Sequence, residues 1–174
     1  TEAVQNLVNN IPWDQSGSKV GNAGNGSAMR AAPIGLFYHN QPEELVTMSV
    51  RQSFITHQDS RCAAGATAIA SGVAYLLSHP SFQPEGFVQH VIEQVQPLYP
   101  YKYNLGSGLN FLLKSWLHLP FEEALQAISQ YGNDYSNEWS GISPFVTGSV
   151  LWAFYSFLKS PDYYLETIYI AIRC

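Results

Sequence analysis

The sequence is short of charge. Only 12% of its 174 residues are Asp, Glu, Lys or Arg, about half the usual share in globular proteins. The net charge is −5 and the eight Lys and Arg residues are scattered, whereas binding to a nucleic-acid duplex requires a clustered basic face. We therefore expect no nucleic-acid partner. So low a charged fraction also predicts that another segment or chain covers part of the surface, so that exposed apolar surface could drive association.

Cysteine is also scarce. Cys62 and Cys174 are far apart in the sequence and form neither a metal-binding nor a redox spacing. We expect both thiols to be reduced and structural. Because disulfides belong to oxidising compartments, this usage favours a cytoplasmic location.

Two long stretches contain no charged residue, but their composition is not that of membrane-spanning helices. Residues 62–78 and 139–158 carry no charge, and their length alone is compatible with crossing a bilayer. Both carry Ser, Thr and Gly throughout. We therefore interpret them as buried helices of a soluble bundle and expect no membrane partner.

Hydrophobic residues make up 46% of the chain, which is enough for the core of one domain. Apolar residues recur at helical spacings, and no alternating strand pattern persists. We predict an all-α fold, a single-domain orthogonal helical bundle of about seven helices with Gly-rich ligand loops at one end. The seven predicted helices are 42–54, 60–77, 83–96, 109–116, 121–131, 144–158 and a last one beginning at Pro161. Residues 1–10 could add a short helix, and residues 31–37 are expected to form the short, buried start of one.

Loops and ends complete this prediction. Gly106 and Gly108 are expected to form a loop before the helix at 109–116, and residues 132–140 a polar loop. The last helical pattern reaches Cys174 without a C-cap, and Thr1 is not an initiator residue. We therefore expect one domain over residues 1–174 that is incomplete at both ends.

The stretch GNAGNGSAMRAAPIG, residues 21–35, places four glycines near a Met-Arg pair. Successive backbone N–H groups in such a loop can form a concave anion site. Glycine removes the side chains that would keep a ligand away, and Asn22 and Asn25 could hydrogen-bond a ribose. The alternative is a long turn before a helix.

Two further stretches could contribute to binding. His57 and Asp59 precede a helix whose N-terminus favours anions, although Asp59 could serve only as the helix cap and His57 as an ordinary loop residue. Gly141, Ile142 and Phe145 lie at a loop-to-helix junction, where an aliphatic and an aromatic side chain could sandwich a nucleobase. The alternative for these three is plain core packing.

In this order, three segments resemble the ADP-ribosylglycohydrolase family, the relatives of dinitrogenase reductase-activating glycohydrolase. They are GNAGNGSAMRAAPIGL, ITHQDSRCAAGATAIA and the stretch from Gly141 to Cys174. The resemblance covers essentially the whole chain. It implies an all-helical hydrolase that cleaves the glycosidic bond between ADP-ribose and a modified protein side chain or a small-molecule conjugate, with two magnesium ions, or manganese in some members.

The resemblance also implies roles for individual residues. The diphosphate and ribose would be wrapped by Asn22, Ala23, Gly24, Asn25 and Gly26. Met29 and Arg30 would hold this loop, Arg30 through a salt bridge below it. His57 would contact the phosphates. The adenine end would be lined by Gly141, Ile142 and Phe145.

The metal ligands of the family have no counterpart in this sequence. Its threonine-aspartate-aspartate segment is not matched, and its Gly-Gly-Asp-x-Asp-Thr motif would follow Cys174. A magnesium pair needs clustered oxygen ligands, but Asp14, Asp59, Asp134 and Asp162 are dispersed. We therefore predict an ADP-ribose platform that supplies no metal ligands, and we name no catalytic residue.

Three hypotheses remain open at this stage. The chain is a fragment of a working hydrolase, a member that binds ADP-ribose or another nucleotide without hydrolysing it, or a structural, crystallin-like protein of the same fold. The low charged fraction and the unfinished last helix favour the first. An ADP-ribosylated protein or ADP-ribose itself would be the partner in the first two.

Overall fold

The computed structural model describes residues 2–98, 104–132 and 139–174, and all regular secondary-structure elements within these ranges are helices. It contains ten α-helices and one 3-10 helix, more than the seven expected, and β-type pairing is limited there to isolated bridges. The extra elements are mostly short helices near the termini and loops. The elements are α1 Glu2–Val8, α2 Gly26–Met29, α3 Ala32–Phe37, α4 Pro42–Phe54, α5 Ser60–Ser78, α6 Pro84–Val95, α7 Leu105–Lys114, η1 Trp116–His118, α8 Phe121–Gln130, α9 Val146–Lys159 and α10 Tyr164–Ile172.

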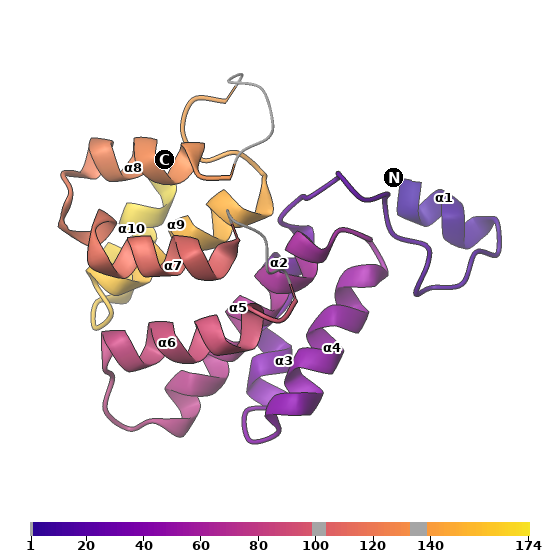
Figure 1. Ribbon diagram of the computed structural model, residues 1–174, viewed down its shortest axis with the longest axis horizontal. Helices are drawn as coiled ribbons and strands as arrows, with labels where there is room; N and C mark the ends of the chain where they lie inside the picture. Colours follow the sequence, from indigo (N-terminus) through magenta and orange to yellow (C-terminus); the bar gives the residue numbers. More distant parts are fainter. Residues whose placement is uncertain (1, 99–103, 133–138) are drawn as a thin grey trace.

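Helix α5 is the centre of the molecule and packs against α2, α3, α4, α6 and α9 (Figure 1). Its small residues allow this close approach. A Cβ atom at Gly65 would overlap the side chain of Val146 in α9, and one at Gly72 would lie 3.3 Å from the ring of Phe87 in α6. The expected burial of the two uncharged stretches is confirmed for most of α5 and α9. In the part of the chain that the structure describes, no helix is both long and apolar enough to cross a membrane.

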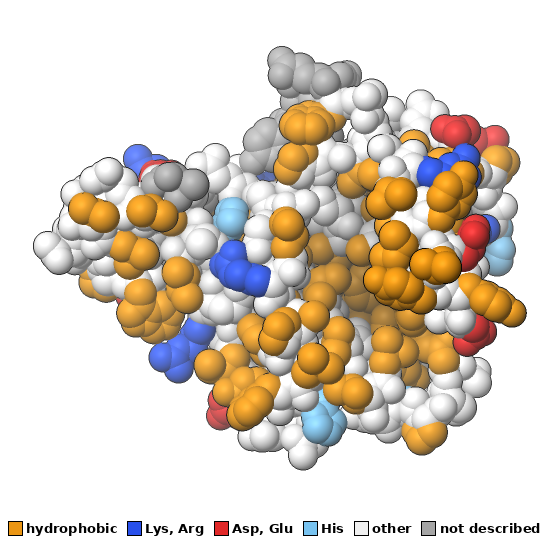
Figure 2. Space-filling model, turned by 180° about the vertical axis from the view of Figure 1, so that it is seen from behind, with side chains coloured by type: hydrophobic (Ala, Val, Ile, Leu, Met, Phe, Trp, Pro, Cys, Tyr) orange, Lys and Arg blue, Asp and Glu red, His pale blue; other side chains and the backbone are white. Residues whose placement is uncertain are grey.

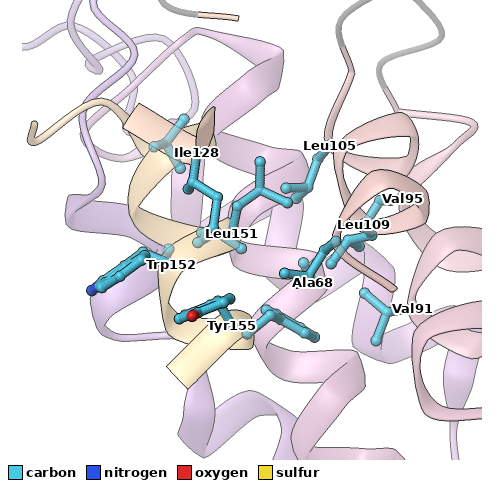
Figure 3. Packing of buried hydrophobic residues seen from close by; sticks show 14 of the residues in the cluster. Ala68, Val91, Val95, Leu105, Leu109, Ile128, Leu151, Trp152 and Tyr155 are labelled. Atoms are coloured by element: carbon cyan, nitrogen blue, oxygen red, sulfur yellow. The ribbon is translucent and has the colours of Figure 1, made fainter. Parts of the chain in front are cut away.

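The largest core cluster lies where α9 meets α5, α6, α7 and α8 (Figure 3). Leu109 of α7, Ile128 of α8 and Leu151 of α9 are completely buried there, next to Tyr155. Removing such a side chain from a close-packed core costs about 2–5 kcal/mol. This cluster therefore fixes α9, and with it the loop that precedes α9.

The predicted loop at Gly106 and Gly108 is wrong, because both glycines lie inside α7. The Asn104 side chain starts the helix by accepting a hydrogen bond from the Ser107 N–H at 2.7 Å. Gly108 faces α9, where a Cβ atom would lie 2.8 Å from side-chain atoms of Leu151 and Tyr131. Glycine at this position permits close helix packing and does not interrupt the helix.

The predicted start of the last helix at Pro161 is also wrong. A turn closed by the Tyr163 N–H and the Ser160 carbonyl, 3.3 Å apart, holds Pro161 outside the helix, and α10 begins at Tyr164. Only Ile170 of α10 is buried, and the side chains of Tyr164, Leu165 and Ile172 are largely exposed. Seen from behind, hydrophobic side chains gather around a hollow in the surface (Figure 2).

Candidate functional site

The glycine loop, residues 21–26, is held against the segment that leads into α9. Gly24 and Phe145 form an isolated antiparallel bridge. The Val146 N–H donates to the Ala23 carbonyl and the Asn25 N–H donates to the Pro144 carbonyl, each at 2.9 Å. Two segments more than a hundred residues apart in the sequence are thereby joined.

Residues just before the loop are tied to the segment before α5. Ser18 and His57 form a parallel bridge, in which the Ser18 N–H donates to the Thr56 carbonyl at 2.9 Å and the Gln58 N–H donates to the Ser18 carbonyl at 2.8 Å. The glycine loop is therefore supported from two sides. Its backbone is positioned by hydrogen bonds rather than by large side chains.

The imidazole of His57 lies directly against the loop. A Cβ atom at Gly24 would be 3.2 Å from His57 Nε2, and one at Gly26 would be 3.3 Å from His57 Cε1. Nδ1 of the same ring is hydrogen-bonded to Thr56 Oγ1 at 2.8 Å, which fixes the ring orientation. Only glycine leaves this space open, so the sequence signal of repeated glycines corresponds here to a close approach.

Electrostatics keep His57 neutral near pH 7. Burial lowers its pKa below the ordinary value of 6.5, and the positive charge of Arg30 lowers it further, while Asp59 partly opposes both. An anion that binds next to a neutral imidazole raises its pKa, so that the ring can take up a proton near neutral pH. The ring is thus positioned to respond to a charged ligand on the loop.

Two backbone amides of the loop are available to a ligand. Within residues 2–98, 104–132 and 139–174, the N–H groups of Gly24 and Gly26 have no hydrogen-bond acceptor. Unpaired N–H groups on a glycine-rich turn are the usual donors of a backbone anion site.

Arg30 lies under the loop, but the predicted salt bridge is replaced by three hydrogen bonds. Its guanidinium donates to the Gly26 carbonyl at 2.9 Å, the Gln52 carbonyl at 2.9 Å and Thr56 Oγ1 at 2.6 Å. These bonds connect the loop to the end of α4. Met29 is 78% exposed, so its side chain projects outward.

An open pocket of about 360 Å³ adjoins the loop, and Asn25 and Ile142 both line it. The Asn25 side chain donates to Ser149 Oγ at 3.0 Å, and that hydroxyl donates to the Ser143 carbonyl at 2.9 Å. Trp139 and Trp152 contribute aromatic surface to the same pocket.

The other two residues assigned to the adenine end are placed differently. Phe145 is only 5% exposed and belongs to the core cluster, with the Arg61 guanidinium 5.4 Å from its ring centroid. Gly141 has a φ of +90°, and a Cβ atom there would lie 2.8 Å from the carbonyl carbon of Cys174. Neither residue is among those that line the pocket.

The start of α5 completes the site. Asp59 caps this helix by accepting a hydrogen bond from the Arg61 N–H at 2.9 Å, as one of the two interpretations predicted. Behind the loop, the buried thiol of Cys62 donates to the Gly24 carbonyl at 3.3 Å, and burial raises its pKa to about 12. Both cysteines are free, as expected, but Cys174 is exposed.

The sequence was then compared with known proteins. The model of a family described as ADP-ribosylglycohydrolase matches residues 1–174. The chain belongs to the ADP-ribosylglycohydrolase family. It is also similar to a protein of Archaeoglobus fulgidus described only as uncharacterized, with 34% identity over 99 residues. That alignment covers 55% of this chain and 30% of the archaeal protein, and no solved structure matches.

The described residues of this ADP-ribosylglycohydrolase chain do not fit a magnesium pair. Among them, no group of three or more His, Cys, Asp or Glu side chains is placed to hold a metal ion. Asp14 and Asp162 are exposed, and Asp59 is already bound by Arg61. Asp134 and the loop around it lie outside the described residues.

Two residues of the site in this ADP-ribosylglycohydrolase were not predicted as functional from the sequence. Ser149 was missed, although it lies one helical turn after Phe145 and its hydroxyl is the partner of Asn25. Thr56 was noted only as part of a motif, and its hydroxyl contacts both Arg30 and His57. The only available signal was proximity in sequence to residues that had been selected.

Proposed function

We propose that this chain forms the ADP-ribose-binding part of an ADP-ribosylglycohydrolase, which cleaves the bond between ADP-ribose and a modified protein side chain or small-molecule conjugate. One observation carries the proposal. In the described residues the N–H groups of Gly24 and Gly26 have no acceptor, and both glycines leave open the space next to the His57 imidazole that a side chain would fill. A diphosphate is the part of ADP-ribose that such donors would bind.

The surroundings of the loop suit the rest of the nucleotide. The Asn25 amide is at the rim of the 360 Å³ pocket, where it could reach a ribose hydroxyl, and Ile142 offers an apolar surface to the adenine. Trp139, which is 60% exposed, provides a ring on which a base could stack. Asn22, at the exposed start of the loop, would face the same ligand.

Hydrolysis by the family is associated with magnesium, which would polarise ribose hydroxyls and orient water. The described residues do not provide its ligands, so we derive no hydrolytic step from them. Binding without hydrolysis and a structural role are the alternatives that the experiments below separate.

Isothermal titration of the purified chain with ADP-ribose tests the binding proposal directly. We expect saturable binding in the wild type and none in Asn25→Trp, because the larger ring would fill the space beside the loop. The matched control is Asn110→Trp, an exposed position on α7, which should bind like the wild type. Equal affinity in the wild type and Asn25→Trp would contradict the proposal.

Release of ADP-ribose from a modified protein, measured with and without magnesium, tests the hydrolase part. Magnesium-dependent release would assign hydrolysis to this chain. Binding without release would favour the non-catalytic alternative, and neither binding nor release would favour a structural role.

A further inference from the structure

Asp59 uses more of its carboxylate than a helix cap requires. A cap needs one side-chain oxygen to accept one N–H group of the first turn. Asp59 Oδ1 does so for the Arg61 N–H at 2.9 Å. Its other oxygen, Oδ2, accepts a hydrogen bond from the N–H of Gly21 at 2.8 Å. Gly21 is the first residue of the glycine loop, so one carboxylate joins the loop to α5.

The carboxylate is buried and fully engaged. Asp59 is 2% exposed, and the Arg61 side chain donates to Oδ1 from Nε and to Oδ2 from Nη2, each at 2.9 Å. Bidentate pairing of this kind fixes the plane of the carboxylate. Burial alone would raise the pKa of Asp59, but the hydrogen bonds from Arg61 and Gly21 outweigh it and lower the pKa.

Gly21 adopts a backbone conformation that favours glycine. Its φ is +106°, and no atom outside its immediate chain neighbours would lie within 4 Å of an added Cβ. A side chain at this position would therefore have nothing to pack against, and polar contacts hold the backbone. The charge-assisted hydrogen bond to Asp59 is one of them, beside the Ala23 N–H that donates to the Gly21 carbonyl at 3.1 Å.

The same pair reaches the far side of the loop. The Arg61 guanidinium lies 5.4 Å from the ring centroid of Phe145, and Phe145 is the bridge partner of Gly24. Both flanks of the loop, at Gly21 and at Gly24, are thus connected to the Asp59–Arg61 pair.

We propose that Asp59 is a positioning residue for ligand binding, which sets the glycine loop through the Gly21 N–H while Arg61 fixes the carboxylate. The consequence for ADP-ribose rests on the proposed function. The tether itself can be measured without any ligand. Neither Asp59 nor Arg61 is assigned a contact with the nucleotide.

The test compares three substitutions that separate the cap from the tether. Asp59→Ala removes both. Asp59→Ser restores a good helix cap but has no second oxygen for Gly21. Asp59→Asn keeps one acceptor oxygen for the cap and presents an NH₂ group, rather than an acceptor, on the other side. Asp162→Asn, at an exposed position far along the chain, is the control.

Hydrogen exchange at the Gly21 amide is the readout that a simple cap would not affect. We expect the rate to rise about tenfold or more in all three Asp59 variants. Thermal stability should be lost in Asp59→Ala and recovered only in part in Asp59→Ser, because serine restores the cap but not the pairing with Arg61. Affinity for ADP-ribose should fall about tenfold in Asp59→Ser and Asp59→Asn, and Asp162→Asn should change neither quantity.

A wild-type exchange rate at Gly21 in Asp59→Ser would overturn the tether and leave Asp59 a cap. Accelerated exchange with undiminished ADP-ribose affinity would overturn its positioning role. If the wild-type chain does not bind ADP-ribose, the proposed function fails on its own, and the Gly21 exchange rate still decides the tether.

Discussion

The glycine loop and helix α10 hold their places by opposite means. The loop has few large side chains, yet hydrogen bonds tie it to the start of α5, to the end of α4 and to the segment before α9. Helix α10 carries many large apolar side chains, but only Ile170 is buried and Leu165 is 81% exposed. Hydrogen bonds to neighbouring segments therefore hold the loop in place, whereas most of the apolar side chains of α10 are exposed.

This contrast shows what each region needs from the rest of the chain. A loop fixed by backbone hydrogen bonds keeps its shape when few atoms surround it. A helix with an exposed apolar face gains stability chiefly when that face is buried. Substitutions in the loop should therefore affect ligand binding, and substitutions on α10 should affect association.

The largest effect is expected from Gly24→Val. The new side chain would occupy the space beside His57 Nε2, which a Cβ atom alone approaches to 3.2 Å. We expect ADP-ribose affinity to fall by about a hundredfold or more, equivalent to about 2.7 kcal/mol. The free energy of unfolding should fall by about 1–3 kcal/mol, because the valine side chain overpacks the space next to the His57 ring. Titration and thermal unfolding check both, with the exposed position Gln15→Val as control.

A smaller effect is expected from Arg30→Met. The substitution removes the hydrogen bonds to the Gly26 and Gln52 carbonyls, which should destabilise the fold by about 1–2 kcal/mol and weaken ADP-ribose binding about tenfold. The control Arg51→Met loses the same charge at an exposed position of α4, away from the loop. If both variants weaken binding equally, general charge attraction and not support of the loop is responsible.

The pH dependence of binding should be milder still. Burial and Arg30 lower the pKa of His57 in the free protein, and a bound diphosphate would raise it, so binding takes up a proton. Affinity should therefore rise as the pH falls through the raised pKa of the complex, by at most about tenfold per pH unit, and level off below the lowered pKa of the free protein. His57→Gln should bind with a flat profile in the same titrations.

The free energy of unfolding should depend on pH in the opposite direction to ligand affinity, because of the same His57 residue. Because its pKa is lower in the folded protein than the ordinary 6.5, the unfolded chain binds protons first, and stability decreases as the pH falls below that value. Denaturant titrations at several pH values should show this decrease in the wild type and a smaller one in His57→Gln.

We expect Leu165→Ser on α10 to leave ADP-ribose binding unchanged. The free energy of unfolding should change by less than about 0.5 kcal/mol, because the side chain is exposed. Sedimentation velocity should show self-association of the wild type and less of it in the variant, since exposed apolar patches promote association. Leu77→Ser, at a half-exposed position of α5, should sediment like the wild type.

Local sequence signals predicted some elements closely. Helix α4 runs from Pro42 to Phe54 as expected, because proline at the first helical position and two acidic residues in the first turn mark its start. The same signal was misleading at Pro161, where a turn precedes α10. At Gly108 the reason for glycine is its contact with Leu151, a long-range contact that no local pattern reveals.

The site was predicted less fully than the fold. Repeated glycines indicated an open loop, but only the resemblance to a family joined it to residues 141–145. Phe145 was assigned to the adenine end through the resemblance, while the residues alone left core packing open, and its ring lies in the core cluster. The hydrogen bond from the Gly21 N–H to Asp59 Oδ2 could not be predicted from local sequence, because the two residues are 38 positions apart.

The two thiols differ in a way that offers a practical handle. Cys62 is inaccessible and protonated at every pH at which the protein would be handled, whereas Cys174 is open to solvent at the edge of the pocket. Thiol-reactive dyes should therefore attach at a single position without any engineering, and fluorescence from that position would report directly on occupancy of the neighbouring cavity.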